Sequence, residues 1–416
     1  MRRRHPKPAQ VWLALGAIVA ATAPGAASGQ QDPSVLAGVQ YLRGHYANKQ
    51  SGESAMIALG LLKAEVPPTD PAVVGCLARC RSRFTESGYI PELTDGRGVY
   101  EAAAVTLAMV NQDPAENLAW IRILAGYLIG AQKPNGSWDY SHRSAGDTSI
   151  SQYAVLGLWE AENAGVTIPP VVWDRAADWF LSTQGAAGSW TYHRDEASVG
   201  ADTLSMTAAG VGSLLICQRQ LEQFRQSRRG ISPLMTALNA ESWANFRPAT
   251  TAAQIDQAVK RGMTWLSANF SLTNLTAVGH SPYYMLYGIE RIGALAERQT
   301  IGRVDWYERG RSFIHSSQQG DGSWNGTYGV EMNTVWAMLF VTKSTAKTIQ
   351  KIQVKRLGAG TLLGGRGLPS DLTALTVAGG RVVSRPMNGA IEGMLAVLED
   401  PRAEQADAAV AGLVDR

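Results

Sequence analysis

"QQGDGSW" at residues 318–324 is the third copy of a short phrase that decides the fold of this chain. The earlier copies read "QKPNGSW" at 132–138 and "QGAAGSW" at 184–190. Each copy consists of Gln, three further residues and Gly-Ser-Trp, and apolar stretches with helical spacing flank it. Repetition on this scale is typical of an architecture built from similar units. We therefore expect repeated pairs of helices joined by this phrase.

The glutamine, the glycine and the tryptophan of the phrase each have a structural role. The glycines end the first helix and permit the turn, and the tryptophans anchor the turn against its neighbour. The glutamines are long enough to bond backbone groups that a helix end leaves open. The recurring glutamines and tryptophans are Gln132, Trp138, Gln184, Trp190, Gln318 and Trp324. These roles predict a scaffold and by themselves indicate no reaction.

The second helix of each unit is expected to begin at an Asp-Thr or Asn-Thr pair. Asp147, Asp202 and Asn333 are good helix N-caps, and each opens an apolar stretch. A helix that is apolar on every side is buried, whereas the first helix of each unit is amphipathic, so we expect an outer and an inner layer. With three weaker copies there are six helical pairs, which can close into a ring. The predicted fold class of residues 34–343 is all-α.

The N-terminus has the layout of a secretory signal peptide. Four basic residues within positions 2–7 precede an apolar run at 11–21 and small residues at 26–29. An uncleaved anchor helix is the alternative, although the apolar run is short for a membrane span. We expect residues 1–29 to be removed and the mature protein to be exported to the periplasm.

Residues 344–416 lie outside the repeats and form a short C-terminal extension. A glycine-rich connection comes first, and it lacks the Gly-Lys-Ser/Thr ending of a phosphate-binding loop. A terminal helix is expected at 388–400.

Charge and cysteine content exclude several function classes. The chain has 38 basic and 35 acidic residues, and removal of the four basic residues of the leader leaves 34 against 35. A near-neutral protein has no electrostatic footprint for nucleic acid. Three cysteines argue against a disulfide framework, and no His or acidic residue lies at metal-ligand spacing from Cys76 and Cys80. We expect no metal, no cofactor and no nucleic-acid partner.

The three Gln-x3-Gly-Ser-Trp copies resemble the QW repeats of the prenyltransferase and squalene-oxidase repeat group. That group includes squalene–hopene cyclases, oxidosqualene cyclases and the β subunits of protein prenyltransferases. The resemblance covers residues 34–343. It implies an (α/α)6 toroid of six helical hairpins, with the inner helices around a central cavity.

The acid that squalene–hopene cyclases use is missing at the matching position. The resemblance implies an Asp-x-Asp-Asp-Thr motif, in which carboxyl neighbours make one Asp a strong proton donor. The matching stretch here is "VGADT" at 199–203, where Ala201 stands at the donor position. Protein prenyltransferases hold zinc with an Asp two residues before a Cys, and no Asp-x-Cys occurs in this chain. We expect neither squalene cyclisation nor a zinc site.

Polar residues are expected at the starts of the inner helices, where a toroid would gather them round one mouth. They are Glu53, Glu101, Asp147, Asp202, His280 and Glu331. One interpretation is a carboxyl cluster with shifted pKa values that faces a ligand. The other is ordinary capping and favourable charge at helix N-termini. The weak catalytic candidates are Asp202, His280 and Glu101.

Aromatic residues on two expected inner helices are candidates for the wall of a ligand cavity. They are Tyr283, Tyr284, Tyr287, Trp336 and Phe340. Their π faces would attract cations or lie against an apolar chain. The alternative is that they fill a solid core.

Three functions stay open at this point. The first is an exported protein that binds an apolar, isoprenoid-like small molecule, either without catalysis or as a divergent isomerase or transferase. The second is an exported glycan-active hydrolase or lyase, because (α/α)6 barrels also carry paired carboxylates. The third is a non-catalytic module that binds a protein partner.

Overall fold

The computed structural model describes residues 32–193, 203–225, 243, 246–272 and 281–351, together with the backbone of 376–378 and 381–383. The chain divides into two compact units, Met1–Ser344 and Thr345–Arg416. Four sequence-based expectations lie outside the described residues: the signal peptide at 1–29, the candidates Asp202 and His280, and the helix at 388–400.

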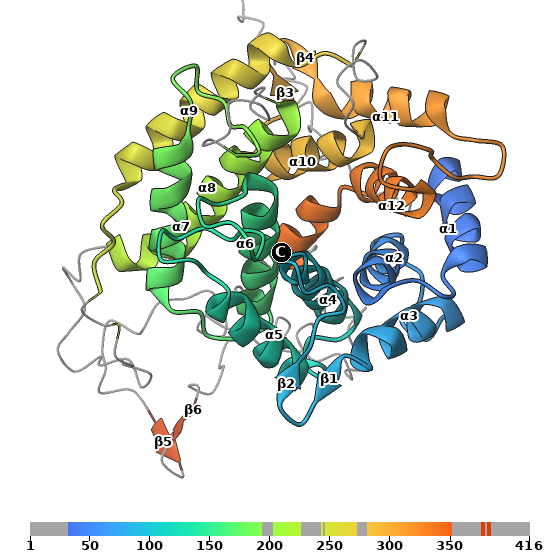
Figure 1. Cartoon of the computed structure of the whole chain (residues 1–416), viewed down its shortest axis with the longest axis horizontal. Helices are drawn as coiled ribbons and strands as arrows, with labels where there is room; N and C mark the ends of the chain where they lie inside the picture. The colour runs from blue at the N-terminus through green and yellow to red at the C-terminus, as the bar shows by residue number, and fades with distance from the viewer. Residues whose placement is uncertain are drawn as a thin grey trace, which may run out of the picture. The chain divides into compact units, whose positions relative to one another are not determined.

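In the described part of the N-terminal unit, Met1–Ser344, nearly all the regular secondary structure is helical, and an outer set of helices alternates along the chain with an inner set. The outer helices are α1 (Pro33–His45), α3 (Pro71–Arg81), α5 (Leu118–Gly130), α7 (Pro170–Thr183), α9 (Ala252–Asn269) and α11 (Trp306–Ser317). The inner helices are α2 (Ser51–Lys63), α4 (Gly98–Gln112), α6 (Thr148–Asn163), α8 (Leu204–Arg225), α10 (Pro282–Leu295) and α12 (Val330–Val341). Figure 1 shows the inner set nearer the middle of the unit. The prediction of an all-α fold class is confirmed.

Each inner helix packs against the next. α2 contacts α4, α4 contacts α6, and the series continues through α8, α10 and α12 until α12 contacts α2. Small residues permit the close approach, since a Cβ added to Gly157 of α6 would lie 2.9 Å from the Cα of Ala103 in α4. In α6 every residue from Thr148 to Ala161 is buried. A helix that is apolar on every side is expected to be buried, and α6 is buried in this way.

The outer helices bury a single face. In α9 the buried residues are Ile255, Ala258, Gly262 and Leu266, which recur at helical spacing along one side. The opposite face carries charged side chains such as the exposed Lys260. The outer layer therefore shields the inner helices on one side and meets solvent on the other.

The glutamine of each repeat phrase connects its own turn to the next outer helix. Nε2 of Gln132 donates to the carbonyl oxygen of Gly136 at 3.0 Å and to that of Val172 in α7, also at 3.0 Å. The other copies make the same pair of bonds: Gln184 to Gly188 and to Ala258 of α9, and Gln318 to Gly322 and to Ser34 of α1. The last of these bonds joins the final outer helix to the first.

The tryptophan of each phrase connects an outer helix to the inner helix that follows it. Trp138 is fully buried. Its Nε1 donates to the carbonyl oxygen of Leu128 in α5 at 2.7 Å, and its backbone N–H donates to Oγ of Ser151 in α6 at 2.9 Å. The other copies do the same: Trp190 bonds Phe180 and Thr207, and Trp324 bonds Ile314 and Thr334.

Two inner helices begin where the Asp-Thr pairs predicted. The carboxylate of Asp147 accepts from the backbone N–H of Ile150 at 2.6 Å, so the prediction that Asp147 caps α6 is confirmed. At the start of α8 the hydroxyl of Thr203 accepts from the N–H of Met206 at 3.0 Å. These bonds satisfy N–H groups that a helix N-terminus leaves open.

The predicted role of Asn333 is wrong. α12 begins at Val330, so Asn333 lies inside its first turn. Gly329 takes a left-handed φ of 85°, which lets the chain enter the helix earlier than the sequence suggested. Nδ2 of Asn333 donates to the carbonyl oxygen of Gly329 at 2.5 Å, and its Oδ1 accepts from the hydroxyl of Ser281 before α10. Asn333 thus connects the starts of two neighbouring inner helices.

The described strands are short and pair in antiparallel fashion. In the N-terminal unit they are β1 (Phe84–Thr85) with β2 (Gly88–Tyr89), and β3 (Thr300–Ile301) with β4 (Val304–Asp305). In the second unit β5 (Thr376–Ala378) pairs with β6 (Arg381–Val383). We expected only a glycine-rich connection and a helix in that region. The missed signal is Gly379-Gly380, a pair typical of two-residue hairpin turns.

Candidate ligand-binding site

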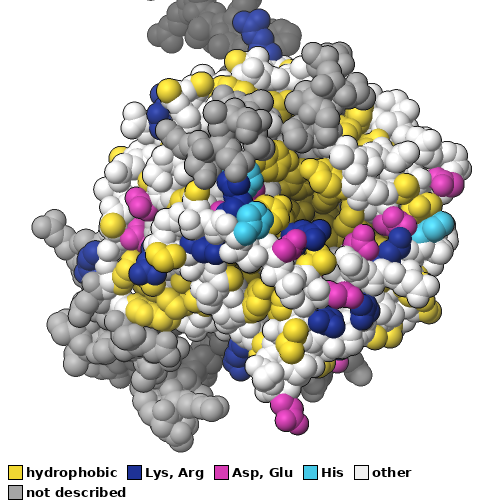
Figure 2. All heavy atoms as spheres, viewed as in Figure 1, with side chains coloured by type: hydrophobic (Ala, Val, Ile, Leu, Met, Phe, Trp, Pro, Cys, Tyr) yellow, Lys and Arg dark blue, Asp and Glu magenta, His cyan; other side chains and the backbone are white. Residues whose placement is uncertain are grey.

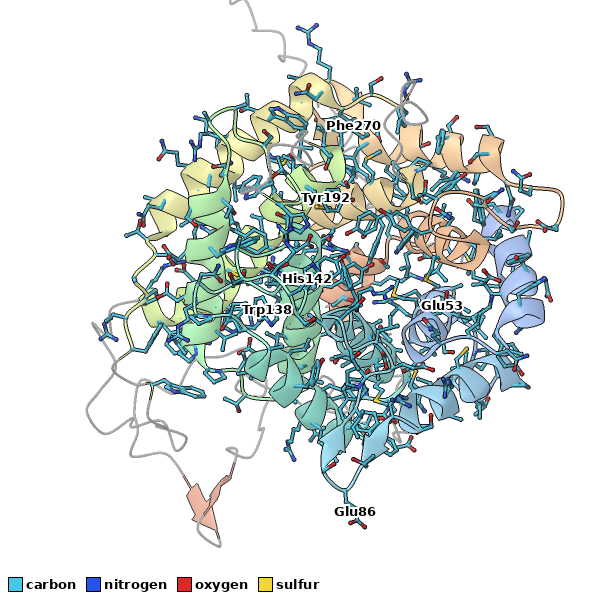
Figure 3. The ribbon with its side chains drawn as sticks, viewed as in Figure 1. Glu53, Glu86, Trp138, His142, Tyr192 and Phe270 are labelled. Atoms are coloured by element: carbon cyan, nitrogen blue, oxygen red, sulfur yellow. The ribbon has the colours of Figure 1, made fainter. Side chains whose placement is uncertain are left out.

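The N-terminal unit is hollowed near the middle of the face shown in Figure 2, and hydrophobic side chains line the depth of this hollow. Histidine and charged side chains lie beside it. Tyr192 and His142 come from the turns after Trp190 and Trp138, and both lie near the middle of the unit in the same view (Figure 3). The candidate site consists of the side chains that the inner helices and these turns bring together.

Five aromatic side chains from four inner helices and one turn form what we call the aromatic group. Its members are Tyr100 of α4, Tyr153 of α6, Tyr284 of α10, Trp336 of α12 and Tyr328 of the turn before α12. Ring centroids lie 5.0 Å apart between Tyr284 and Trp336, 6.5 Å between Tyr284 and Tyr153, and 5.1 Å between Tyr100 and Tyr153. Tyr328 lies 5.5 Å from Trp336 and is 44 % exposed, so the group extends from the interior to solvent.

Two of the predicted wall residues lie elsewhere. Tyr283 packs against Phe313 of α11, with ring centroids 6.0 Å apart. Phe340 packs against Trp306 and Tyr307, at 5.8 and 5.6 Å. Both fill the space between the inner helices and α11, and we withdraw them as ligand contacts. Successive helical residues point about 100° apart, so neighbours on one helix face different sides.

A polar group lies next to the aromatic group in the interior. Gln152 of α6 donates from Nε2 to the hydroxyl of Tyr284 and accepts at Oε1 from Nη1 of Arg291, the latter at 2.8 Å. The guanidinium of Arg291 lies 4.6 Å from the ring centroid of Tyr287. The sequence contained a signal for this group, because Gln152 and Arg291 interrupt apolar inner helices and a buried polar side chain needs a partner.

A carboxylate and an imidazole meet at the start of α6. Oδ2 of Asp147 lies 3.2 Å from Nε2 of His193, while Oδ1 accepts from the hydroxyl of Ser149 at 2.5 Å as well as capping the helix. Burial raises the pKa of Asp147 above its ordinary value, although Ser149, Ile150 and His193 act to lower it. Asp147 is therefore more than a cap, and its partner His193 was not among the candidates.

The phenols of the site stay neutral at physiological pH. Burial raises the pKa of Tyr100, Tyr153 and Tyr284 above that of an ordinary tyrosine. Burial also raises the pKa of Tyr192, and the neighbouring Tyr328 adds to this effect. A neutral phenol presents both an apolar ring and a hydroxyl that can donate or accept a hydrogen bond. Each of these side chains can therefore offer both an apolar contact and a hydrogen bond.

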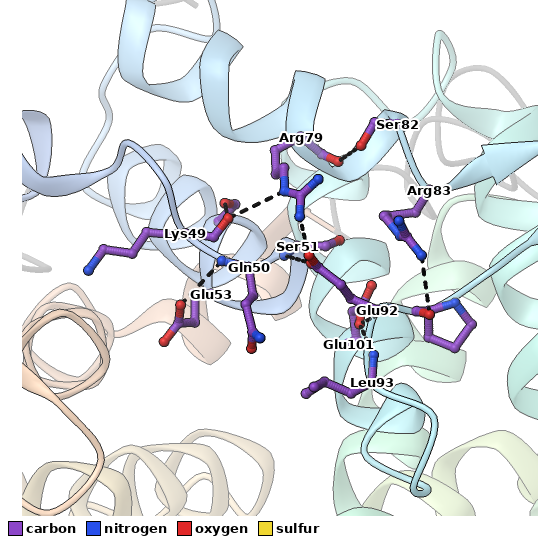
Figure 4. Close-up of polar contacts among 12 residues, drawn as sticks. Lys49, Gln50, Ser51, Glu53, Arg79, Ser82, Arg83, Glu92, Leu93 and Glu101 are labelled. Atoms are coloured by element: carbon purple, nitrogen blue, oxygen red, sulfur yellow. Dashed lines mark hydrogen bonds and ion pairs between the residues drawn. The ribbon is translucent and has the colours of Figure 1, made fainter.

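Glu101 has a structural role, and we withdraw it as a catalytic candidate. Glu101 is only 2 % exposed. Oε1 accepts from the hydroxyl of Tyr89 at 2.8 Å, and Oε2 accepts from the backbone N–H groups of Glu92 and Leu93 at 2.8 and 3.4 Å (Figure 4). Both oxygens are thus used to hold the loop after β2 against α4.

Two further polar residues at the inner-helix starts, Glu53 and Glu331, also have protein partners. Glu53 forms a capping box with Gln50 at the start of α2. Glu331 forms an ion pair with Lys49 at 2.5 Å. Burial acts to raise the pKa of Glu331, but the bond from Lys49 outweighs burial and lowers this pKa below its ordinary value. In the described part of the chain, no three His, Cys, Asp or Glu side chains are grouped so that they could hold a metal ion.

No protein-family model matches the chain, and no curated protein matches it either. Among the helices within the described ranges, none combines the length and the apolar character that crossing a membrane requires.

Proposed function

We propose that residues 34–343 form an (α/α)6 toroid of six helical hairpins, of the prenyltransferase and squalene-oxidase repeat type. The closed series of contacts from α2 through α12 back to α2 supports this architecture. The bond from Gln318 to Ser34 supports it as well, because it joins the last outer helix to the first. We further propose that residues 1–29 direct export to the periplasm.

We propose that this toroid binds an apolar, isoprenoid-like small molecule in its central hollow. The observation that carries this proposal is the aromatic group, in which rings from four inner helices and a turn lie close to one another. Tyr153, Tyr284 and Trp336 keep exposed fractions of 5, 8 and 7 %, and the group continues to the exposed Tyr328. A chain of partly accessible rings offers apolar and π contacts to a ligand that enters from solvent.

The proposed function includes no squalene cyclisation. Ala201 occupies the position of the proton donor, and no Asp-x-Asp-Asp occurs in the chain. A methyl group donates no proton, and protonation of an alkene needs a strong acid.

The test is to incubate the full-length protein with squalene and with geranylgeraniol, and to measure retained ligand and products by mass spectrometry. We expect retention of at least one unchanged compound. Tyr284→Leu should lower the retained amount about tenfold, whereas Tyr283→Leu, one residue away but facing α11, should change it less than about twofold. Retention of an oligosaccharide and of neither lipid would favour the glycan-active alternative. Retention of neither class would favour a partner-binding module.

A further inference from the structure

His193, in the turn after Trp190, is held by one of its two ring nitrogens. Its Nε2 lies 3.2 Å from Oδ2 of Asp147, whose side chain is 1 % exposed. A carboxylate only accepts hydrogen bonds, so this contact places a proton on Nε2 and leaves Nδ1 of the neutral ring as an acceptor. Nδ1 is buried and has no hydrogen-bond partner in the part of the chain that the structure describes. The ring therefore has one side fixed as a donor and an unused acceptor on the other.

This unused acceptor indicates a ligand that carries a hydrogen-bond donor. Buried polar atoms in proteins nearly always have a partner, and an atom without one lowers stability. The side chain of His193 as a whole keeps 11 % exposure, so the imidazole can be approached from solvent. Its neighbour Tyr192 lies near the middle of the N-terminal unit (Figure 3). His193 thus belongs to the candidate site, and its missing partner is an O–H or N–H group.

Asp147 connects this imidazole to the aromatic group. Its Oδ1 accepts from the hydroxyl of Ser149, and the hydroxyl oxygens of Ser149 and Tyr100 lie 2.5 Å apart. Since the hydrogen of Ser149 is used on Asp147, Tyr100 is the donor in this second bond. The ring centroids of Tyr100 and Tyr153 lie 5.1 Å apart. An apolar chain that lies against these two rings can place its end near His193.

We propose that Nδ1 of His193 accepts a hydrogen bond from the hydroxyl of an elongated apolar alcohol whose chain lies against the aromatic group. This inference rests on the proposed function, because it uses the same hollow, and it adds the chemistry of the ligand's head group. Asp147 is a positioning residue, since its carboxylate fixes the tautomer in which Nδ1 accepts. An ether has no hydrogen to donate, so the site selects the alcohol over the ether with the same chain.

The test compares farnesol with farnesyl methyl ether, which share one apolar chain and differ in the O–H group. Binding of each compound to the full-length protein is followed by quenching of tryptophan fluorescence at about pH 8, where an imidazole is ordinarily neutral. We expect the wild-type protein to bind the alcohol about tenfold more tightly than the ether. His193→Phe keeps a ring and removes the acceptor, so it should bring this ratio to about one.

Two further variants separate a ligand contact from a structural role. The amide of Asp147→Asn can donate to Nε2 of His193, which moves the ring proton to Nδ1. A donor at Nδ1 bonds the oxygen of the alcohol and of the ether alike, so the ratio should again be about one, with no change in the ring itself. His142→Phe is the matched control: the rings of His142 and His193 lie 5.9 and 6.4 Å from that of Tyr140, and the preference of this variant for the alcohol should stay as in wild type.

Equal binding of alcohol and ether by the wild-type protein would overturn this inference and leave the proposed apolar site intact. It would also be overturned by an Asp147→Asn or His193→Phe variant that keeps the preference for the alcohol. Loss of both ligands and of Tm in His193→Phe, with an unchanged ratio in Asp147→Asn, would assign His193 a structural role instead. If the wild-type protein binds neither compound, the proposed function fails with it.

Discussion

Nε2 of Gln318 donates a hydrogen bond to the carbonyl oxygen of Ser34 at 2.9 Å, across 284 positions of sequence. Asp32, the N-cap of α1, adds to this junction, because its carboxylate bonds Arg311 and His315 of α11 at 3.0 Å. The two ends of the helical series are therefore joined by side chains of α11 and of its turn.

We expect Gln318→Ala to lower the free energy of unfolding by about 1–3 kcal/mol, because two carbonyl oxygens lose their donor. Chemical denaturation measures this change. Gln319→Ala is the matched control: this exposed neighbour bonds only within its own turn, and its loss should cost less than about 0.5 kcal/mol. Equal effects of the two substitutions would contradict the role given to Gln318.

Gly136→Ala should destabilise the protein by about 2–4 kcal/mol. Gly136 has a φ of 90°, and a Cβ at this position would lie 2.1 Å from the carbonyl oxygen of Arg175 in α7. Gly130→Ala serves as the comparison, because a Cβ there meets nothing within 4 Å. Its Tm should stay unchanged or rise, since alanine favours a helix by up to about 1 kcal/mol over glycine. A stable Gly136→Ala variant would show that the turn can move away from α7.

The bonds of Asp32 predict a loss of stability in acid. Burial acts to raise the pKa of Asp32, but the bonds from Ser34 and Arg311 and the charge of His315 outweigh it and lower that pKa below the ordinary value. A lowered pKa in the folded state means that the stabilisation is present above the unfolded value of about 3.9 and is lost as the pH falls through the folded value.

Asp32→Asn should therefore cost about 1 kcal/mol near pH 6, a small effect because Arg311 and His315 are partly exposed. The difference from wild type should shrink below about pH 4. Urea titrations across this range measure it. A difference that does not vary with pH would mean that the carboxylate charge is not what joins α1 to α11.

The contribution of Asp147 to stability should change with pH in the opposite direction to that of Asp32. Burial raises its pKa in the folded state, so its contribution to stability is fully present below about pH 3.9 and is lost as the pH rises through the folded value. Asp147→Asn keeps a side chain that can cap α6 at Ile150. Asparagine does not ionise, so the variant does not lose stability at this position as the pH rises. The variant should gain stability relative to wild type as the pH rises, which denaturation at pH 4 and pH 7 can measure. Greater destabilisation at pH 7 than at pH 4 would refute this interpretation.

Much of the fold could be predicted because its signals are local. Gly136 and Trp138 mark a turn and its anchor within a few residues, and the apolar runs that flank each phrase show helical period. Asp147 could be recognised as a cap for the same reason. Asn333 could not be placed, because the start of α12 depends on the left-handed Gly329 and on a bond to Ser281 of a neighbouring helix.

The candidate site could be predicted only in outline. Tyr284 and Trp336 are candidates for a cavity wall on the sequence alone, and their rings do lie together, but Tyr283 and Phe340 face α11. Helical period alone shows that Tyr283 and Tyr284 point in different directions. It does not show which direction leads to the hollow.

Helical pairs with buried inner helices could be inferred from the sequence alone, because capping, turn formation and helical period act over neighbouring residues. The residue pairs of the site follow from the tertiary structure: Asp147 meets His193 from the next repeat, and Gln152 meets Arg291 across 139 positions. Such contacts depend on how far each inner helix is rotated and shifted against the next. That rotation and shift result from the packing of all the helices together, which no short stretch of sequence encodes.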